Sequence, residues 1–358
     1  MKLTKLSYKD PNWELLNLEL DDLNLIVGKN STGKSKTLFT IDLLVKLITQ
    51  KRDLNWGGLW NLEFKNHTNN TIVFEFATSY KEGGIVTAEK IAIDGVQVLF
   101  RYKDGSVVLR NKLSNDNDTT YPPANKLAVH TNRDIKKYPY LEEIINWAEQ
   151  SYGFQFGNIS PNTQLSEQSY ELLTTIEDIP TLYNSLSESD KQDVLDSFNK
   201  VGYQISSIRV DQRGEFVIIY VKEESIQKAI PHHKLSQGMF RALAIVIFLE
   251  YLNSRKRPST IIIDDLCEGL DYERATKLGK LIFEQCKEND IQLIVTSNDV
   301  FLMDVVDIKH WNILQRKGRI VSGLNNKNSK DLFQKFRFTG LSNFDLFASD
   351  FINQQIND

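Results

Sequence analysis

Gly28-Lys29-Asn30-Ser31-Thr32-Gly33-Lys34-Ser35 is the stretch of sequence that decides the fold. It matches the pattern G-x-x-x-x-G-K-[ST] of the phosphate-binding P-loop. The apolar run Leu23–Val27 precedes it and predicts a buried strand, and Thr37–Ile48 follows with apolar residues at helical spacing. Strand, glycine-rich loop and helix are the setting that this motif needs. A chance match in a loop rich in lysine and serine is therefore the weaker interpretation.

The residue types of this loop suit a nucleoside triphosphate. Backbone N–H groups of a tight loop, together with the positive end of a helix dipole, can surround phosphates. Gly28 and Gly33 allow the required dihedral angles and a close approach. We expect Lys34 to contact the outer phosphates and the Ser35 hydroxyl to bind Mg²⁺. The predicted nucleotide-binding residues here are Gly28, Lys29, Asn30, Ser31, Thr32, Gly33, Lys34, Ser35 and Lys36.

The composition is that of an ordinary globular chain. Its 358 residues suit a single α/β head with an inserted lobe, and the net charge of −4 gives no chain-wide sign of a nucleic-acid or membrane partner. Cys267 and Cys286 have no metal-binding spacing, which predicts a reducing compartment without disulfides. The N-terminus reads as a strand rather than a signal peptide, and no apolar run reaches the length of a membrane span. We expect a cytoplasmic protein.

Strand-like and helical patterns alternate along the chain. Leu3–Leu20 predicts a hairpin around Pro11-Asn12. Further predicted strands are 71–76, 85–93, 97–102, 107–110 and 126–129, predicted loops are 53–67 and 114–123, and predicted helices are 140–152 and a small acidic lobe over about 164–199. A second hairpin is expected over 203–210 and 215–221, followed by an apolar helix over 241–252, closed by the cations of 255–257. Buried strands are predicted at 260–263 and 291–296, with a helix over 275–286 between them, which indicates a parallel sheet.

An acidic pair stands at the end of one buried strand. Ile261, Ile262 and Ile263 run directly into Asp264 and Asp265. A strand that delivers carboxylates at its C-terminal end can hold the Mg²⁺ of a phosphate site. We expect Asp264 to hold the metal through water and Asp265 to orient or deprotonate the attacking water.

With these motifs in order, the sequence resembles the ABC-type ATPases, and most closely their compact SMC/RecF-like and OLD-like soluble branch. Residues 235–239 (LSQGM) resemble the signature loop, which the family writes LSGGQ. Residues 264–271 (DDLCEGLD) resemble the Walker B segment running into the D-loop. The resemblance implies a P-loop head with a mixed sheet, a flanking antiparallel β-subdomain and a small helical lobe. It also implies ATP and Mg²⁺ as cofactors.

The resemblance further implies head-to-tail dimers that sandwich ATP. Ser236 and Gly238 of one chain would contact the γ-phosphate bound by Lys34 of the other, and Asp271 would lie in the same interface. Closure would then depend on ATP. Many members of this branch act on DNA or in antiphage defence beside a nuclease, which predicts a homodimer or higher oligomer with a nuclease-like protein effector.

Three departures from the family pattern point to slow hydrolysis. Gln237 and Met239 replace residues of the signature but leave its serine and second glycine. Asp265 stands where the family has a longer Glu, although Glu268 is near enough in sequence to assist. Asn298 stands where the family has a switch His, and an amide cannot carry charge. These changes suit a switch better than a motor, with Asp265, Lys34 and Asn298 as the catalytic residues.

Other features carry weaker hypotheses. Adjacent side chains rarely converge on one metal ion, so an ordinary structural role for His232 and His233 is favoured over metal binding. His130 and Arg133 lie roughly where a γ-phosphate-sensing loop is expected, but no glutamine was found there and that site stays unassigned. A basic stretch is formed by Lys309, Arg316, Lys317, Arg319, Lys327, Lys330, Lys335 and Arg337, and six phenylalanines follow or interleave with it: Phe333, Phe336, Phe338, Phe344, Phe347 and Phe351.

Two functions remain open at this point. The first is an ATP-driven switch that controls a partner effector, with the basic stretch as a surface or docking face and the phenylalanines packed on the chain's own core or on a partner. The alternative is a RecF-like repair ATPase whose basic stretch binds nucleic acid. We expect four segments within one head: 1–134 with the P-loop and antiparallel part, 135–230 with the helical lobe and hairpin, 231–308 with the signature, Walker B and switch strand, and the tail 309–358.

Overall fold

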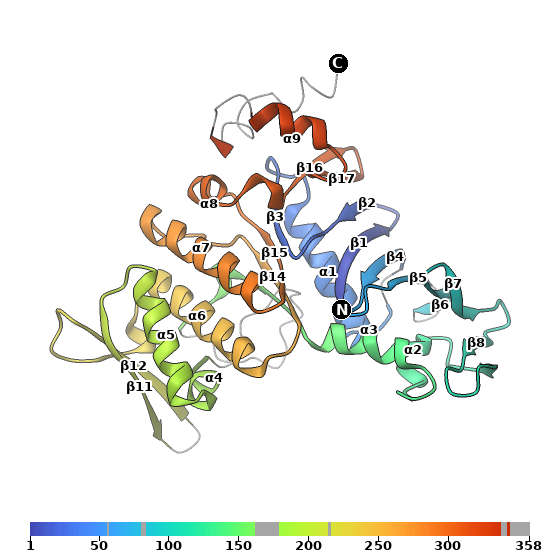
Figure 1. Cartoon of the computed structure of the whole chain (residues 1–358), viewed down its shortest axis with the longest axis horizontal. Coiled ribbons are helices and arrows are strands. Elements are labelled where there is room, and N and C mark those ends of the chain that lie inside the picture. The colour runs from blue at the N-terminus through green and yellow to red at the C-terminus, as the bar shows by residue number, and fades with distance from the viewer. Residues whose placement is uncertain (56, 80–83, 162–178, 214–215, 338–341, 344–358) are drawn as a thin grey trace. The chain divides into compact units, whose positions relative to one another are not determined.

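The loop of residues 28–35 lies between a buried strand and a helix, as the sequence predicts. In the computed structural model β3 (Leu23–Val27) is buried at every residue, and α1 (Lys34–Ile48) begins at the lysine of the loop. The structure describes residues 1–358 except 56, 80–83, 162–178, 214–215, 338–341 and 344–358 (Figure 1). The chain divides into two compact units, one of residues 1–24, 28–152 and 312–328, the other of residues 25–27, 153–311 and 329–358.

The first unit is built on a long, mainly antiparallel sheet. Its strands are β1 (Lys2–Lys9), β2 (Glu14–Glu19), β4 (Gly58–Lys65), β5 (Thr71–Ser79), β6 (Ile85–Ile93), β7 (Val96–Arg101), β8 (Val107–Arg110), β9 (Asn117–Thr120), β16 (Trp311–Lys317) and β17 (Ile320–Leu324). They lie in the order β16-β17-β2-β1-β4-β5-β6-β7-β8-β9. Every pair is antiparallel except β17 with β2, which is parallel. The sheet is therefore mixed, as expected.

Two helices accompany α1 in this unit, α2 (Ala128–Thr131) and α3 (Pro139–Glu149). A buried ion pair fastens the start of α2 to the sheet. The Arg101 Nη2 atom lies 3.0 Å from Glu89 Oε2, and both side chains are almost fully buried. The same carboxylate accepts a hydrogen bond from the Ala128 N–H at 2.8 Å, and Arg101 also donates to the Lys126 carbonyl at 2.7 Å.

The second unit contains parallel strands that are fully buried. Strands β14 (Ser259–Asp264) and β15 (Ile291–Thr296) pair in parallel and are buried throughout, and the strand order is β10-β14-β15-β3, with β10 at Ser151–Gln155. A separate sheet has the order β11-β12-β13, formed by β11 (Ile205–Arg213), β12 (Phe216–Glu223) and β13 (Ile230–Pro231). The α-helices are α4 (Ile179–Ser185), α5 (Glu188–Lys200), α6 (Gln237–Arg255), α7 (Tyr272–Glu288), α8 (Val300–Val305) and α9 (Lys330–Arg337). Short 3₁₀ turns are η1 (Phe156–Asn158), η2 (His232–Lys234) and η3 (Ile308–His310).

The helical lobe packs around α6. Figure 1 shows α4, α5, β11 and β12 at one end of the second unit, and α4 and α5 both contact α6. Helix α6 is apolar along most of its length, so it is buried against these elements, and Ala242–Leu249 are all buried. None of the described helices combines the length and the apolar content that a bilayer crossing requires.

Four local predictions were wrong. Residues 58–65, expected in a loop, form β4, because Trp60, Leu62 and Phe64 alternate inward despite the Gly and Asn residues around them. The expected strand at 126–129 is instead the start of α2, and the expected loop at 114–123 contains the edge strand β9. The helix expected over 140–152 ends at Glu149, after which β10 begins.

The acidic lobe and the tail are described in part. Helices α4 and α5 agree with a helical lobe, and Ser187 caps α5 in a capping box with Asp190. The rest of that predicted helical pattern, 164–178, lies outside the described residues. Of the six phenylalanines, Phe333 is buried at 1% exposure, while Phe338, Phe344, Phe347 and Phe351 lie outside the described residues. The division into four segments stays a prediction.

Candidate nucleotide site

The glycines of the P-loop occupy positions that other residues would not tolerate. Gly33 is the N-cap of α1 with a φ of 102°, in the left-handed region. A Cβ at Gly28 would collide with Thr32 Oγ1. Ser31 between them is also left-handed, with a φ of 65°. The loop therefore has a specific backbone shape that depends on both predicted glycines.

Lys34 lies over this loop. Its ammonium donates a hydrogen bond to the Gly28 carbonyl at 2.7 Å, and its residue is only 7% exposed. Ser35, in the first turn of α1, is exposed, as are Lys29, Asn30 and Lys36. The Lys36 ammonium stands 4.9 Å from the centre of the Trp13 ring. A loop of N–H groups with a lysine across it and a hydroxyl at the helix start is an arrangement that can bind phosphate and a hard cation.

In the second unit, strand β14 delivers Asp264 as predicted. The carboxylate is 1% exposed and accepts a hydrogen bond from Thr296 Oγ1 at 2.5 Å and one from Gln155 Nε2 at 3.4 Å. Both donors are neutral, and a buried carboxylate is stable only when it is well paired. Carboxylate and hydroxyl oxygens are the ligands that Mg²⁺ prefers, so the Asp264 carboxylate of this unit and, separately, the Ser35 hydroxyl of the first unit are each suitable ligands for that ion.

Thr296 holds the second acid as well. The Asp265 N–H donates to Thr296 Oγ1 at 2.9 Å, and Asp265 has a left-handed φ of 52°. The Asn298 side-chain amide donates to Asp265 Oδ1 at 3.4 Å. The structure therefore brings together Asp265 and Asn298, two of the three residues predicted to be catalytic. The carboxylate of Glu268, suggested as an assistant, lies against Gly157.

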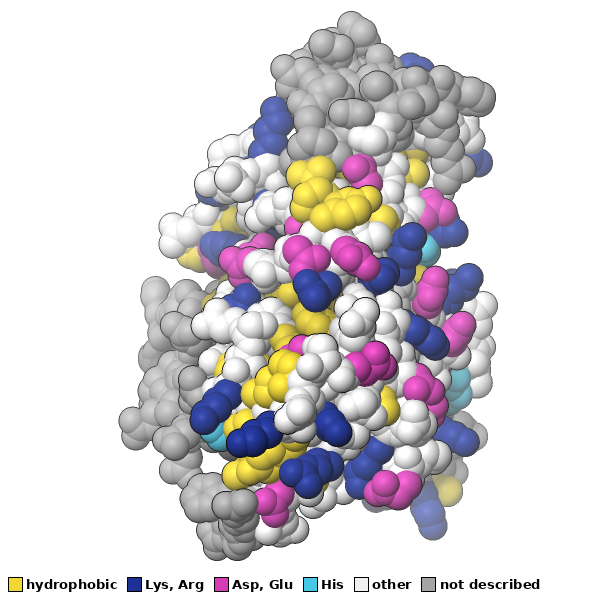
Figure 2. Space-filling view, turned by 90° about the vertical axis from the view of Figure 1, so that its left-hand side faces the viewer, with side chains coloured by type: hydrophobic (Ala, Val, Ile, Leu, Met, Phe, Trp, Pro, Cys, Tyr) yellow, Lys and Arg dark blue, Asp and Glu magenta, His cyan; other side chains and the backbone are white. Residues whose placement is uncertain are grey.

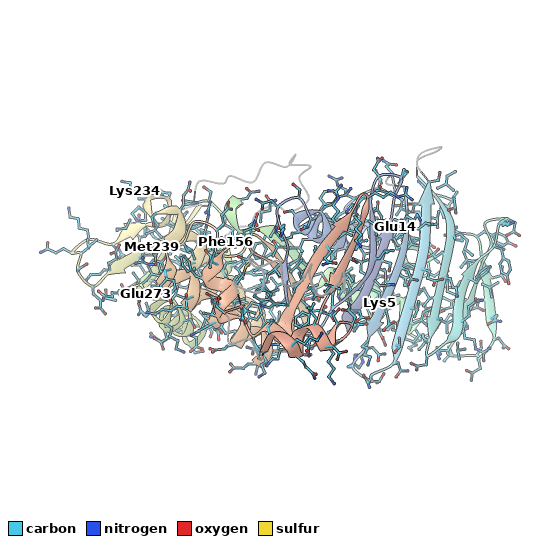
Figure 3. All side chains as sticks on the ribbon, turned by 90° about the horizontal axis from the view of Figure 1, so that it is seen from above. Lys5, Glu14, Phe156, Lys234, Met239 and Glu273 are labelled. Atoms are coloured by element: carbon cyan, nitrogen blue, oxygen red, sulfur yellow. The ribbon has the colours of Figure 1, made fainter. Side chains whose placement is uncertain are left out.

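The signature and D-loop residues line one pocket in the second unit. Helix α6 begins four residues earlier than expected, so that Ser236 is its N-cap and accepts from the Met239 N–H at 3.3 Å. Helix α7 begins three residues earlier, with Asp271 as its N-cap. The pocket has a volume of about 610 Å³, and its lining includes Ser236, Gly238, Met239, Asp271, Arg274, Tyr203 and Glu223. Figure 3 labels Met239 at the start of α6 and Glu273 at the start of α7.

Arg274 is the cation of this pocket. Its guanidinium lies 4.7 Å from the centre of the Tyr203 ring and pairs with Asp271. Burial raises the pKa of Tyr203 to about 12, so its hydroxyl stays neutral. The pocket therefore has polar walls and two helix N-termini, of α6 and α7, which the predicted signature and D-loop roles require.

The histidines considered from sequence have local structural partners. His130 accepts from the Leu127 N–H through Nδ1 at 3.2 Å, and its Nε2 lies 3.1 Å from the Leu47 carbonyl. Burial lowers the pKa of His130 to about 4, so the ring is neutral. Arg133 forms two hydrogen bonds with Glu142, at 2.6 and 2.8 Å. His232 accepts a hydrogen bond from the Ile219 N–H at 3.2 Å, which supports a structural role for this histidine rather than metal binding.

Sequence reasoning missed two residues of the site. Gln155 ends β10, and its side-chain amide donates a hydrogen bond to Asp264. The available signal was the alternation of Tyr152, Phe154 and Phe156, which predicts a strand that delivers Gln155 at its end. The other is Arg316, whose guanidinium donates to the Ser31 carbonyl of the P-loop at 3.1 Å. No local pattern in the sequence indicates that contact, which joins residues 285 positions apart.

Comparison with known proteins finds similarity in sequence and in fold. A family model described as "AAA domain, putative AbiEii toxin, Type IV TA system" matches residues 132–304. The solved structure titled "Crystal structure of the SmcHead bound to the C-winged helix domain of ScpA" superposes with a TM-score of 0.56 at 13% identity, and the match covers 92% of this chain and 100% of that one. The chain is thus similar in sequence to P-loop ATPases of the ABC and OLD type, and its fold is that of an SMC head.

Two curated proteins of different kinds are similar to parts of this chain. It is 28% identical over 133 residues to the energy-coupling factor transporter ATP-binding protein EcfA of Methanococcus maripaludis, a match that covers 37% of this chain and 44% of that protein. It is 22% identical over 322 residues to the OLD nuclease of Thermus scotoductus, with 82% of this chain and 58% of that protein covered. The chain thus spans less than two thirds of either relative.

Proposed function

We propose that this ATPase binds ATP with Mg²⁺ and hydrolyses it slowly. The observation that carries the proposal is the P-loop, with its left-handed Gly33 at the N-terminus of α1 and the Lys34 ammonium over the loop backbone. Asp264, Gln155 and Ser35 would hold the Mg²⁺ ion. Asp265, held by Thr296 and contacted by the uncharged Asn298, would orient water without a charged partner at that position, which supports slow turnover.

Calorimetry or a fluorescent ATP analogue tests this proposal. Lys34→Ala removes the ammonium and should abolish measurable binding. Lys317→Ala removes an exposed lysine of the β16–β17 hairpin and is the matched control. Equal affinity for wild type and Lys34→Ala would refute the assignment of the loop.

The proposed biological role is that of a nucleotide switch. ATP would close two heads head to tail, with Ser236, Gly238 and Asp271 of the pocket facing the nucleotide of the other subunit, and closure would control a protein effector. Two findings support an antiphage setting with a nuclease-like effector: the toxin–antitoxin wording of the matching family and the relative named OLD nuclease. Pull-down from the native host with ATP or a slowly hydrolysed analogue should recover such an effector in a nucleotide-dependent manner.

The alternative is a RecF-like ATPase that binds DNA through the basic stretch. The contacts of that stretch weigh against it. Arg316 and Arg319 donate to the carbonyls of Ser31 and Pro11, and Lys309 pairs with Asp307 at 3.0 Å. On the face shown in Figure 2, cationic and anionic side chains are intermixed.

Salt-dependent binding to duplex DNA separates the two functions. A DNA-binding head should lose affinity steeply as salt rises, and neutralising exposed lysines should flatten that slope. Lys317→Ala with Lys330→Ala is the suitable variant, because Arg316 contacts the P-loop. Tight, salt-sensitive binding by the wild-type protein with ATP, weakened in the double variant, would favour the RecF-like function over the switch.

A further inference from the structure

We propose that Arg316 is a positioning residue for the nucleotide, which it serves by fixing the P-loop through the Ser31 carbonyl. This inference rests on the nucleotide binding proposed above. The Arg316 Nη1 atom donates to Ser31 O at 3.1 Å, while Nε donates to Gly318 O at 2.8 Å in the turn between β16 and β17. One planar guanidinium thus joins the middle of the P-loop to the tip of a hairpin.

The same hairpin lies close to the P-loop at both glycines of its motif. A Cβ placed on Gly28 would stand 3.2 Å from the Leu314 carbonyl of β16. A Cβ placed on Gly33 would stand 3.4 Å from the Val321 side chain of β17. The hairpin therefore lies close to the loop at its first and at its last glycine, and Arg316 supplies a polar contact to Ser31 between these two points.

The hairpin is itself fixed to the start of the chain. The Glu14 N–H donates to the Arg319 carbonyl at 3.0 Å, and the Arg319 guanidinium donates to Pro11 O at 3.3 Å. Strand β17 pairs in parallel with β2, on which Glu14 is labelled in Figure 3. A guanidinium attached to such a rigid element can hold the carbonyl that it contacts in one place.

Ser31 is the residue of the loop that needs such support. Its φ of 65° is disfavoured for a residue with a Cβ, so the loop conformation depends on contacts that stabilise it. A hydrogen bond from a charged donor is stronger than one from a neutral donor. Arg316 therefore favours the loop shape that presents N–H groups to phosphate, and its positive charge adds to the attraction for that anion.

This assignment gives one cation of the basic stretch a different role. The sequence alone groups Arg316 with the other cations of the basic stretch, for which a partner or nucleic acid is the expected contact. Its two carbonyl contacts assign it to the nucleotide site of its own chain. Its neighbour Lys317 is exposed and has the same charge, which makes it a matched control.

The test measures ATP affinity and the unfolding midpoint without nucleotide in wild type, Arg316→Ala, Arg316→Lys and Lys317→Ala. We expect Arg316→Ala to weaken affinity about tenfold, as the loss of a charged hydrogen bond would do. Arg316→Lys should recover part of this loss, because an ammonium keeps the charge and one bond but not the two-carbonyl fork. Lys317→Ala should bind as wild type does. In steady-state hydrolysis, Arg316→Ala should raise KM more than it lowers kcat.

Three results would overturn the inference. Wild-type affinity in Arg316→Ala would do so while leaving the proposed nucleotide binding intact. If Arg316→Ala lowers both the ATP affinity and the unfolding midpoint, and Arg316→Lys restores neither, the role of Arg316 is merely structural. A wild-type protein that binds no ATP would overturn the proposed function first and the inference with it.

Discussion

Asp42, on the helix that follows the P-loop, should make this protein less stable as pH rises from about 4 to 6. Its carboxylate is buried, with a side-chain exposure of 4%, and its partner Lys46 lies at 2.8 Å. Burial outweighs the attraction of Lys46 and raises the pKa of Asp42 from 3.8 to about 6. The variant Asp42→Asn replaces this acid by a neutral amide of the same shape, which mimics the protonated form at every pH.

The sign and size of the effect follow from proton linkage. Between the two pKa values the unfolded chain releases its proton while the folded chain retains it, so the free energy of unfolding falls as pH rises through this window. Each pKa unit corresponds to about 1.36 kcal/mol, so a pKa of about 6 against 3.8 costs the folded wild type about 3 kcal/mol above pH 6. Asp42→Asn should therefore match wild type below pH 4 and exceed it by about 3 kcal/mol near pH 7.

Urea unfolding of both proteins across this pH range measures the difference directly, because the titrations of all other groups cancel in it. Asp53→Asn, which removes an exposed acid a short distance beyond the same helix, is the control for the loss of a negative charge. A stability difference that stays constant with pH, or that favours wild type at pH 7, would refute the reasoning.

Three other predictions follow from described contacts. Asp265→Asn should trap an ATP-bound dimer, and light scattering that finds the same mass with and without ATP would count against the sandwich. Thr296→Val removes the hydroxyl that bonds both acids and should cost about 1 to 3 kcal/mol of unfolding free energy and slow hydrolysis; unchanged values of both would contradict that role. Arg101→Leu leaves Glu89 buried beside a backbone N–H, so denaturation should show a loss of about 3 to 5 kcal/mol, whereas a loss below 1 kcal/mol would contradict a tightly coupled pair.

Local patterns predicted the parts of the fold in which one face or one whole element is buried. The parallel strands β14 and β15 were predicted within one residue of their bounds, because a run of three consecutive branched or aliphatic residues in a short segment suits a covered sheet. The hairpins of the antiparallel sheet were also confirmed, including the turn at Asp94-Gly95, where both residues have positive φ. Strand β4 was missed because its Gly and Asn residues resemble a loop, while only packing on its neighbours shows that Trp60 and Phe64 point inward.

The site was predictable where a motif is contiguous. The P-loop and the Asp264–Asp265 pair each occupy a few adjacent positions, and their chemistry is apparent from residue types alone. Gln155 and Arg316 reach the site from distant elements, and only tertiary structure brings them to Asp264 and Ser31. The beginnings of α6 and α7 were placed too late because the predictions relied on apolar periodicity, whereas the helices begin at their capping residues.

The two N-cap side chains in the signature pocket differ in the hydrogen bonds that they can still form with a ligand. Ser236 accepts the Met239 N–H with its oxygen, so its own hydroxyl proton remains to be donated. Asp271 caps α7 with a carboxylate, which accepts from the Arg274 N–H but has no proton to give at neutral pH. Ser236→Asp would thus keep α6 capped while turning a donor into a charged acceptor. Serine or aspartate at position 236 can therefore cap the N-terminus of α6 equally well, but only the serine hydroxyl can donate a hydrogen bond to a phosphate oxygen.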